Sequence, residues 1–251
     1  DRTQRRIIAR PVRIDHASEE MTDYSLTLTE RVVNAAVKGI MSLLCRVDSE
    51  QLQRVPSRGP LIVVTNHINF LDTPVIYTHA QPRPLTGFAK IETWDSPFLG
   101  PLFTLWGAIP IQRGEADVAA FRRGVAALKE GRILGIAPEG TRSGHGRLQK
   151  GHAGVVTMAL LSGAPLLPVA HYGCEGYRQN LPRLRRTDFN IRVGQPFVLN
   201  PGDARVTRAV REEMADEIMC QLAKLLPPAY RGEYADMSKA TQKYLQFVTL
   251  G

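Results

Sequence analysis

The chain has 251 residues, 43% of them hydrophobic and 22% charged, which is the composition of a globular protein long enough to bury a sizeable core. Its formal net charge of +8 and pI of about 9.7 favour anionic partners, such as a phosphate-bearing substrate, an anionic membrane surface or nucleic acid. A basic surface that only aids solubility is the alternative. The three cysteines, Cys45, Cys174 and Cys220, form neither a metal-binding spacing nor a disulfide framework, so we expect a reducing compartment.

The sequence predicts neither a transmembrane span nor a signal peptide. A span needs about 20 apolar residues, and the best candidate, residues 154–170, is interrupted by Pro165 and Pro168. The N-terminus has no apolar core. Residues 1–20 are polar and rich in arginine, and Met21 offers a natural start. We expect residues 1–20 to be a poorly ordered extension, either derived from a vector or serving as a basic arm.

Apolar residues recur at helical spacing over residues 28–47 and predict an amphipathic helix, which Thr27 or Thr29 can cap. Such a helix can pack on the core, or it can lie on a bilayer with its apolar face down. It belongs to an N-terminal segment, residues 21–50, that precedes the main domain at residues 51–226. Residues 227–251 carry Pro227 and Pro228 and predict an irregular tail with a short helix.

Within the main domain, predicted strands and helices alternate. Strands are predicted at residues 61–65, 86–89, 108–111, 133–137, 166–170 and 189–193, and helices at residues 73–79, 116–130, 151–161 and 206–226. The order is mostly strand then helix, which is typical of an α/β fold. We therefore predict a largely parallel, mixed sheet flanked by helices, together with the N-terminal amphipathic helix.

A histidine and an aspartate follow the first strand of the main domain. His67 and Asp72 are separated by four residues, directly after the apolar run 61–64. A carboxylate at this spacing can hydrogen-bond one imidazole nitrogen and leave the other free to accept a proton. Asp72 can instead cap the helix predicted from Thr73, or it can do both. We expect the pair to act as a general base with its orienting carboxylate.

Two other predicted strand ends carry polar residues. Arg113 ends one strand, and Glu139, Gly140 and Arg142 follow another. Ligands of open α/β sheets bind beyond the carboxyl ends of the strands, so these residues can converge with His67. Two guanidinium groups suit a phosphate monoester, and the glycine leaves main-chain amides free for an anion. Glu139 can alternatively pair with Arg142.

At these residues the chain resembles the glycerophospholipid acyltransferase family, whose best-known members are 1-acylglycerol-3-phosphate acyltransferases. The four motif blocks of that family occur in order, at residues 66–72, 107–113, 139–143 and 165–169. Lys90-Ile91-Glu92, the Pro97 to Gly100 stretch and Lys150-Gly151 also fit the family pattern. The similarity covers roughly residues 55–200.

The resemblance implies a role for each matched residue. His67 is the general base that deprotonates an acceptor hydroxyl, and Asp72 orients it. Arg113 and Arg142 bind the glycerol phosphate, with Lys90 as a helper or as a solvated charge. Glu139, Gly140 and Thr141 shape the acceptor site. The resemblance also implies that the acyl group comes from acyl-CoA or acyl-carrier protein, without a metal or a bound cofactor.

We therefore expect an enzyme that acylates 1-acylglycerol 3-phosphate (lysophosphatidic acid) to phosphatidic acid, at the cytoplasmic face of the inner membrane and without a nucleic-acid partner. The basic surface and the helix at residues 28–47 would attach it peripherally. Alternatives are a lyso-aminolipid or glycerol 3-phosphate as acceptor, a non-catalytic lipid- or phosphate-binding protein, and a thioesterase. The stretch 94–106 belongs either to the core or to a membrane or acyl-chain surface. His79, His145, His152 and His171 receive no role.

Overall fold

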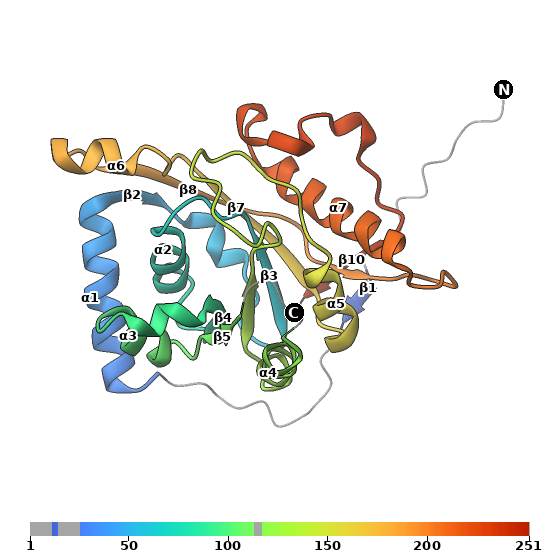
Figure 1. The fold of residues 1–251 in the computed structure, drawn as a ribbon, viewed down its shortest axis with the longest axis horizontal. Coiled ribbons are helices and arrows are strands. Elements are labelled where there is room, and N and C mark those ends of the chain that lie inside the picture. Colours follow the sequence, from blue (N-terminus) through green and yellow to red (C-terminus); the bar gives the residue numbers. More distant parts are fainter. Residues whose placement is uncertain (1–11, 15–25, 113–116, 251) are drawn as a thin grey trace.

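A computed structural model describes residues 12–14, 26–112 and 117–250. Within them, ten strands form one sheet with helices on both faces (Figure 1). The main path of the sheet runs β1-β10-β9-β7-β3-β6-β4-β5, and β8 joins β2 to β7. The strands are β1 (Val12–Ile14), β2 (Cys45–Asp48), β3 (Leu61–Thr65), β4 (Leu85–Lys90), β5 (Ile109–Ile111), β6 (Ile133–Ile136), β7 (Leu166–Tyr172), β8 (Thr187–Val193), β9 (Phe197–Leu199) and β10 (Leu245–Leu250).

The centre of the sheet is parallel. Strand β3 pairs in parallel with β6 and β7, and β4 pairs in parallel with β5 and β6. Antiparallel pairs join β7 to β8 and β9, and β9 to β10. The predicted mixed, largely parallel α/β sheet is therefore confirmed. Because β3, β6 and β7 run side by side in one direction, their carboxyl ends meet at one edge of the sheet.

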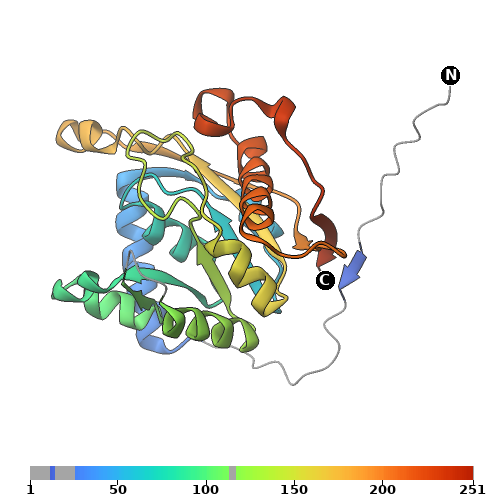
Figure 2. The same cartoon turned by 45° about the vertical axis from the view of Figure 1, so that its right-hand side comes forward.

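Alternate residues of β3 face two different helix layers. Ile62 and Val64 belong to a core with α4 (Val118–Lys129), α5 (Gly154–Ser162) and α7 (Arg208–Leu225). Leu61 and Val63 belong to a second core with α1 (Leu28–Leu44) and α2 (Asp72–His79). Successive strand residues point to opposite faces, so a continuous apolar strand fits a sheet covered on both sides. Figure 2 shows α5 and α7 together on one face.

The N-terminal helix ends three residues before the predicted end at Val47. It starts with a capping box, in which Thr27 and Glu30 bond each other's main-chain N–H groups, and it ends at Leu44. The chain then continues as β2, because Cys45 to Asp48 pair in parallel with β8. The prediction of helix over residues 45–47 is wrong, since an extended conformation lets these residues join the sheet.

The C-terminal segment, predicted as an irregular tail with a short helix, contains three short 3₁₀ turns at Pro228–Tyr230, Gly232–Tyr234 and Met237–Lys239, followed by β10. Strand β10 pairs with β9 and with β1. Of the predicted extension at residues 1–20, Val12–Ile14 form β1, and the other residues lie outside the described part of the chain.

The stretch 94–106 is partly buried and partly exposed. It contains the end of the 3₁₀ turn Ile91–Asp95 and helix α3 (Leu99–Leu105). Trp106 is buried and stacks on Tyr77 of α2, whereas 84% of Phe98 is exposed. The other short helices are the 3₁₀ turns Glu50–Arg54 and Leu181–Arg183 and the helix α6 (Tyr177–Asn180).

Candidate active site

His67 and Asp72 form a hydrogen-bonded pair between the end of β3 and the start of α2. His67 Nδ1 lies 2.8 Å from Asp72 Oδ2, and the same oxygen accepts the main-chain N–H groups of Ile68 at 2.6 Å and Asn69 at 2.9 Å. The carboxylate thus points back along the loop, and the N-cap position of α2 is Leu71. Asp72 orients His67 instead of capping the helix.

The surroundings of Asp72 keep it ionised. Only 3% of the residue is exposed. Burial alone would raise the pKa of the Asp72 carboxyl, but the neighbouring His171 and His67 and their hydrogen bonds hold this pKa well below its usual range. Because Asp72 binds Nδ1 of His67, that nitrogen carries the proton and Nε2 can act as the acceptor.

A cavity of about 360 Å³ lies beside the pair, within the roughly 300–1,000 Å³ range of ligand pockets. Its walls are mostly apolar and come from α2, β4, β6, α5 and the aromatic side chains of Phe103, Trp106 and Phe121. Among the lining residues, the charged or imidazole side chains are His67, Asp72, Lys90 and His152. The cavity can therefore hold a long apolar group with one end at the His67 imidazole.

The loop after β6 is bonded directly to the loop that carries His67. The buried Glu139 accepts the main-chain N–H of His67 at 3.0 Å through Oε1 and that of Gln149 at 3.1 Å through Oε2. In return, the N–H groups of Ser143 and Gly144 donate to the carbonyl oxygens of the first loop at 2.8 and 2.9 Å. Burial raises the pKa of the Glu139 carboxyl, partly offset by these hydrogen bonds. These hydrogen bonds join the two loops directly.

The structure brings together most, but not all, of the predicted site residues. His67, Asp72, Lys90 and Gly140 line the cavity. Gly140 has φ of +66°, a conformation that favours glycine. Glu139 lies behind the site, bonded to main chain, and no ion pair with Arg142 is present among the described residues.

Thr141 and Arg142 are exposed on the same loop and do not line the cavity. Arg142 directly precedes Ser143, whose N–H bonds the carbonyl oxygen of His67, so its main chain lies beside the site. Lys90 is half-exposed and 3.6 Å from Glu92. Arg113 lies outside the described residues, so its predicted role stays a prediction.

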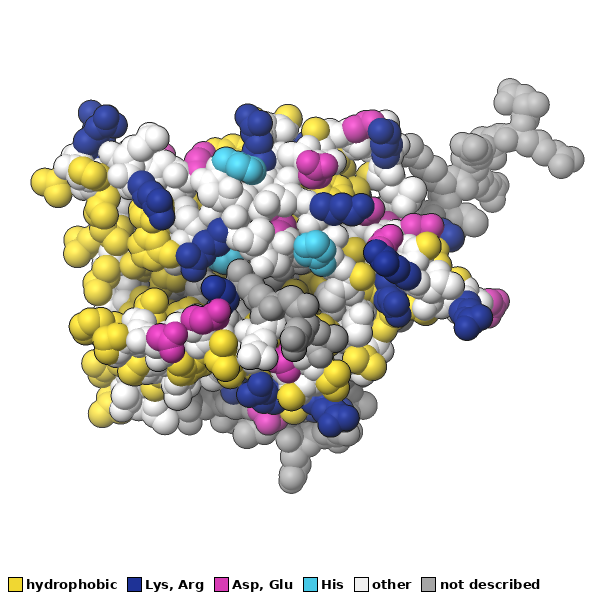
Figure 3. Space-filling model, viewed as in Figure 1, with side chains coloured by type: hydrophobic (Ala, Val, Ile, Leu, Met, Phe, Trp, Pro, Cys, Tyr) yellow, Lys and Arg dark blue, Asp and Glu magenta, His cyan; other side chains and the backbone are white. Residues whose placement is uncertain are grey.

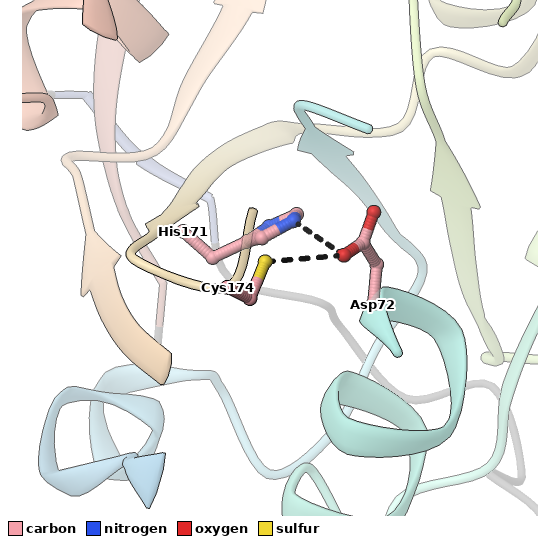
Figure 4. A group of neighbouring side chains, drawn as sticks. All are labelled: Asp72, His171 and Cys174. Carbon is pink, nitrogen blue, oxygen red and sulfur yellow. Dashed lines mark hydrogen bonds and ion pairs between the residues drawn. The ribbon is translucent and has the colours of Figure 1, made fainter. Parts of the chain in front are cut away.

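Sequence reasoning missed two residues that contact Asp72 from behind. His171 and Cys174 are fully buried, and their side chains point at the second oxygen of the carboxylate (Figure 4). His171 Nε2 lies 3.2 Å from Oδ1, and Cys174 Sγ lies 3.6 Å from it. A signal for His171 was present, since it follows the predicted strand at residues 166–170 directly. Strand β7 in fact extends through His171 to Tyr172, because both residues pair with β8.

Asp72, His171 and Cys174 are also a group that can be considered for metal binding. Their ligand atoms lie within 4.8 Å of one another, and no other such group occurs in the described part of the chain. Burial, and then the Asp72 charge, raise the pKa of the Cys174 thiol far above its usual value. Without a metal the sulfur therefore keeps its proton and donates to Oδ1 of Asp72.

The chain matches a family model described as Acyltransferase over residues 46–172, which is half of its length and includes both loops of the site. The chain belongs to the acyltransferase family. The first and third motif blocks, which are hydrogen-bonded to each other, both lie inside the matched region.

Individual acyltransferases are similar to parts of the chain. A 1-acyl-sn-glycerol-3-phosphate acyltransferase of Borreliella burgdorferi is 30% identical over 127 residues, which is 50% of each protein. A lyso-ornithine lipid O-acyltransferase of Pseudomonas aeruginosa is 34% identical over 114 residues, 45% of this chain and 43% of that protein. The chain thus spans about half the length of these curated relatives.

The fold has a counterpart among solved structures of the family. The crystal structure of the 1-acyl-sn-glycerophosphate (LPA) acyltransferase PlsC from Thermotoga maritima matches 78% of each chain with a TM-score of 0.59 and 21% sequence identity. At this identity, the similarity establishes the fold of the acyltransferase family for this chain, and the chemistry has to be argued from the residues of the site.

Proposed function

We propose that the protein transfers a fatty acyl group from an acyl thioester to the free hydroxyl of 1-acylglycerol 3-phosphate, giving phosphatidic acid. The observation that carries this proposal is the His67–Asp72 pair at the wall of an apolar cavity. An imidazole held in one tautomer by an ionised carboxylate is a general base, and an apolar cavity beside it suits an acyl chain. Family membership supports the same reaction class.

The reaction follows from this geometry. His67 Nε2 accepts the proton of the acceptor hydroxyl, and the oxygen attacks the carbonyl carbon of the thioester. The carbon–sulfur bond then breaks, and the leaving thiol takes its proton from His67. Asp72 remains ionised and stabilises the imidazolium that forms between these steps. The protein itself needs no nucleophile, because holding both substrates together supplies much of the rate.

The headgroup of the acceptor would lie at the loop after β6. Arg142 is exposed beside His67, and Lys90 lies on the cavity wall. A guanidinium and an ammonium group at this position are suited to a phosphate monoester. Arg113, also proposed for the headgroup, completes the set predicted from the sequence. Gly140 and Thr141 would border the same headgroup.

Membrane contact is part of the proposal. Exposed apolar side chains gather at the edge formed by α1, α3 and α6, and basic side chains lie close by (Figure 3). The exposed apolar side chains include Leu28, Val32, Ile40 and Leu43 of α1, which are 53–77% exposed. Among the described helices, none combines the length and apolar character needed to cross a bilayer. Apolar side chains together with nearby basic groups suit peripheral attachment, which we place at the cytoplasmic face of the inner membrane.

The test is an acyl-transfer assay with the purified chain in lipid vesicles. Acyl-CoA and acyl-carrier protein are compared as donors, and 1-acylglycerol 3-phosphate, lyso-ornithine lipid and glycerol 3-phosphate as acceptors. We expect phosphatidic acid as product and loss of turnover in His67→Ala. The matched control is His79→Ala, since His79 lies on α2 but not on the cavity. Faster acylation of another acceptor would replace the proposed substrate, and free fatty acid without any acceptor would indicate a thioesterase.

A further inference from the structure

The carboxylate of Asp72 has two oxygens with separate sets of partners. Oδ2 accepts hydrogen bonds from His67 and from two main-chain N–H groups, whereas Oδ1 faces His171 and Cys174 (Figure 4). A buried carboxylate oxygen without a donor costs free energy, so the contacts at Oδ1 affect how Asp72 is held. Cys174 Sγ donates to Oδ1 across 3.6 Å, and His171 Nε2 approaches closer, at 3.2 Å, as an ion-pair contact outside hydrogen-bond geometry.

The position of His171 is fixed by the loop that carries His67. The Asn66 side chain forms two hydrogen bonds with the main chain of His171, accepting its N–H at 2.9 Å and donating to its carbonyl oxygen at 2.8 Å. Asn69 donates to the carbonyl oxygen of Cys174 at 2.8 Å. The first motif block therefore contacts residues 171–174 in two ways. The Asn66 and Asn69 side chains bond the main chain of this segment, and the Asp72 carboxylate faces its side chains. Residues 171–174 are therefore held in place on the side of Asp72 that faces away from His67.

The protonation of His171 follows from its surroundings. Nε2 lies 3.2 Å from a carboxylate oxygen and makes no hydrogen bond of good geometry with any described residue. Because a lone pair there would be repelled by that oxygen, we take Nε2 as the protonated nitrogen. Nδ1 lies 3.3 Å from the hydroxyl oxygen of Thr65, which can donate to it or accept from it. In a neutral ring with its proton on Nε2, Nδ1 accepts from the Thr65 hydroxyl. The ring also stacks on Phe189 of β8, with centroids 5.0 Å apart and planes 8° from parallel, so it cannot rotate freely.

We propose that His171 is a positioning residue for acyl transfer: it donates Nε2–H to Oδ1 of Asp72 and thereby keeps Oδ2 aimed at Nδ1 of His67. The carboxylate would be held between two imidazoles, one at the cavity and one fully buried. The inference rests on the proposed function, because it assigns His171 a part in the same reaction. The positioning role proposed for His171 differs from a packing role, which any apolar side chain of similar size could fill.

Two substitutions at His171 separate these roles. His171→Leu keeps a similar volume but removes the donor, and His171→Gln restores an amide N–H at about the position of Nε2. By analogy with outer partners of metal-bound histidines, we expect kcat of His171→Leu to fall by roughly 10–100-fold, with KM for both substrates within about threefold. His171→Gln should recover most of this loss. The control is Phe189→Leu, which disturbs the packing around the ring and keeps the donor.

NMR of the imidazole N–H protons in labelled protein provides a readout that needs no acceptor. Wild type should show protected signals from His67 Nδ1–H and His171 Nε2–H, and His171→Leu should lose one of them. Wild-type kcat in folded His171→Leu would overturn the proposal. Equal losses in His171→Leu, His171→Gln and Phe189→Leu that follow thermal stability would do the same. An unprotonated His171 Nε2, or a stoichiometric metal in the purified protein, would also overturn the proposal. Absence of acyl transfer by wild type with protected His171 Nε2–H would instead refute the proposed function.

Discussion

Asp72→Asn is the sharpest test of the charge beside His67. During the reaction the imidazole becomes positively charged while Oδ2 of Asp72 lies 2.8 Å from Nδ1. Two unit charges about 4 Å apart attract each other by about 4 kcal/mol at an effective dielectric constant of 20. At about 1.4 kcal/mol per tenfold change in rate, we expect kcat to fall by roughly 10³-fold.

The same substitution should leave the fold intact. The amide oxygen can take the position of Oδ2 and accept the same three N–H groups, while the amide nitrogen faces His171. His171 can meet this nitrogen by moving its proton to Nδ1, where the Thr65 hydroxyl accepts it. We expect a cost of about 1–3 kcal/mol in the free energy of unfolding.

The stability cost should depend on pH in a defined direction. The pKa of Asp72 is lower in the folded protein than in the unfolded chain, where it is about 3.9. Ionisation of Asp72 therefore stabilises the fold above about pH 4, and this contribution is lost as the pH falls toward the folded value. The difference in free energy of unfolding between wild type and Asp72→Asn should be largest near neutral pH and narrow below about pH 4.

Two measurements check this account of Asp72. Release of free thiol from the acyl donor gives kcat, and urea unfolding followed by circular dichroism at several pH values gives stability. A folded Asp72→Asn that retains kcat within about tenfold of wild type, while His67→Ala is inactive, would refute the charge argument, since tenfold corresponds to only about 1.4 kcal/mol. A stability difference that widens in acid would refute the depressed pKa.

Other parts of the site yield three further predictions. Arg142→Ala should raise KM for the phosphate-bearing acceptor by about tenfold with a smaller change in kcat, whereas the nearby exposed Arg147→Ala should not. Glu139→Gln places an amide N–H against a main-chain donor, so thermal denaturation should show a loss of about 1–3 kcal/mol. Leu28→Glu together with Leu43→Glu should weaken sedimentation with anionic vesicles while leaving turnover of detergent-dispersed substrate near wild type.

Much of the sheet could be predicted because its strands carry strong local signals. Strand β3 matches the predicted residues 61–65, since a continuous apolar run fits a strand buried on both faces. The strand-end rule then placed His67 and Asp72 in one loop, and the structure joins them by a hydrogen bond. Local pattern and topology agree at this point, so the interaction could be foreseen.

Local patterns place His171 directly after the predicted strand at residues 166–170, but they could not show that it contacts Asp72. His171 lies about 100 residues further along the chain, and its contact depends on β7 lying next to β3. Its neighbours in sequence are apolar or aromatic and carry no catalytic spacing. The same limit applies to β2, since Cys45 leaves the helical pattern only because β8 offers a parallel partner. Contacts between distant segments decide both cases.

The hydrogen bonds of Asp72 also predict that both substrates are bound together before the acyl group is transferred. Oδ2 already accepts three N–H groups and its carboxyl has a depressed pKa, so Asp72 does not take the proton from His67. The proton that enters through Nε2 must leave through Nε2, which requires the acceptor hydroxyl and the thioester at the imidazole together. No serine or cysteine lines the described cavity to hold an acyl group between two half-reactions.

We therefore expect sequential kinetics, with intersecting double-reciprocal lines when the concentrations of thioester and acceptor are varied together. Donor and free thiol should not exchange label in the absence of acceptor, because no covalent acyl-enzyme forms. A Cys174→Ala variant serves as a control, since its buried, protonated thiol is not a nucleophile and exchange should be absent there as well. Parallel lines, or label exchange without acceptor, would contradict direct transfer and would place a covalent intermediate on a side chain outside this geometry.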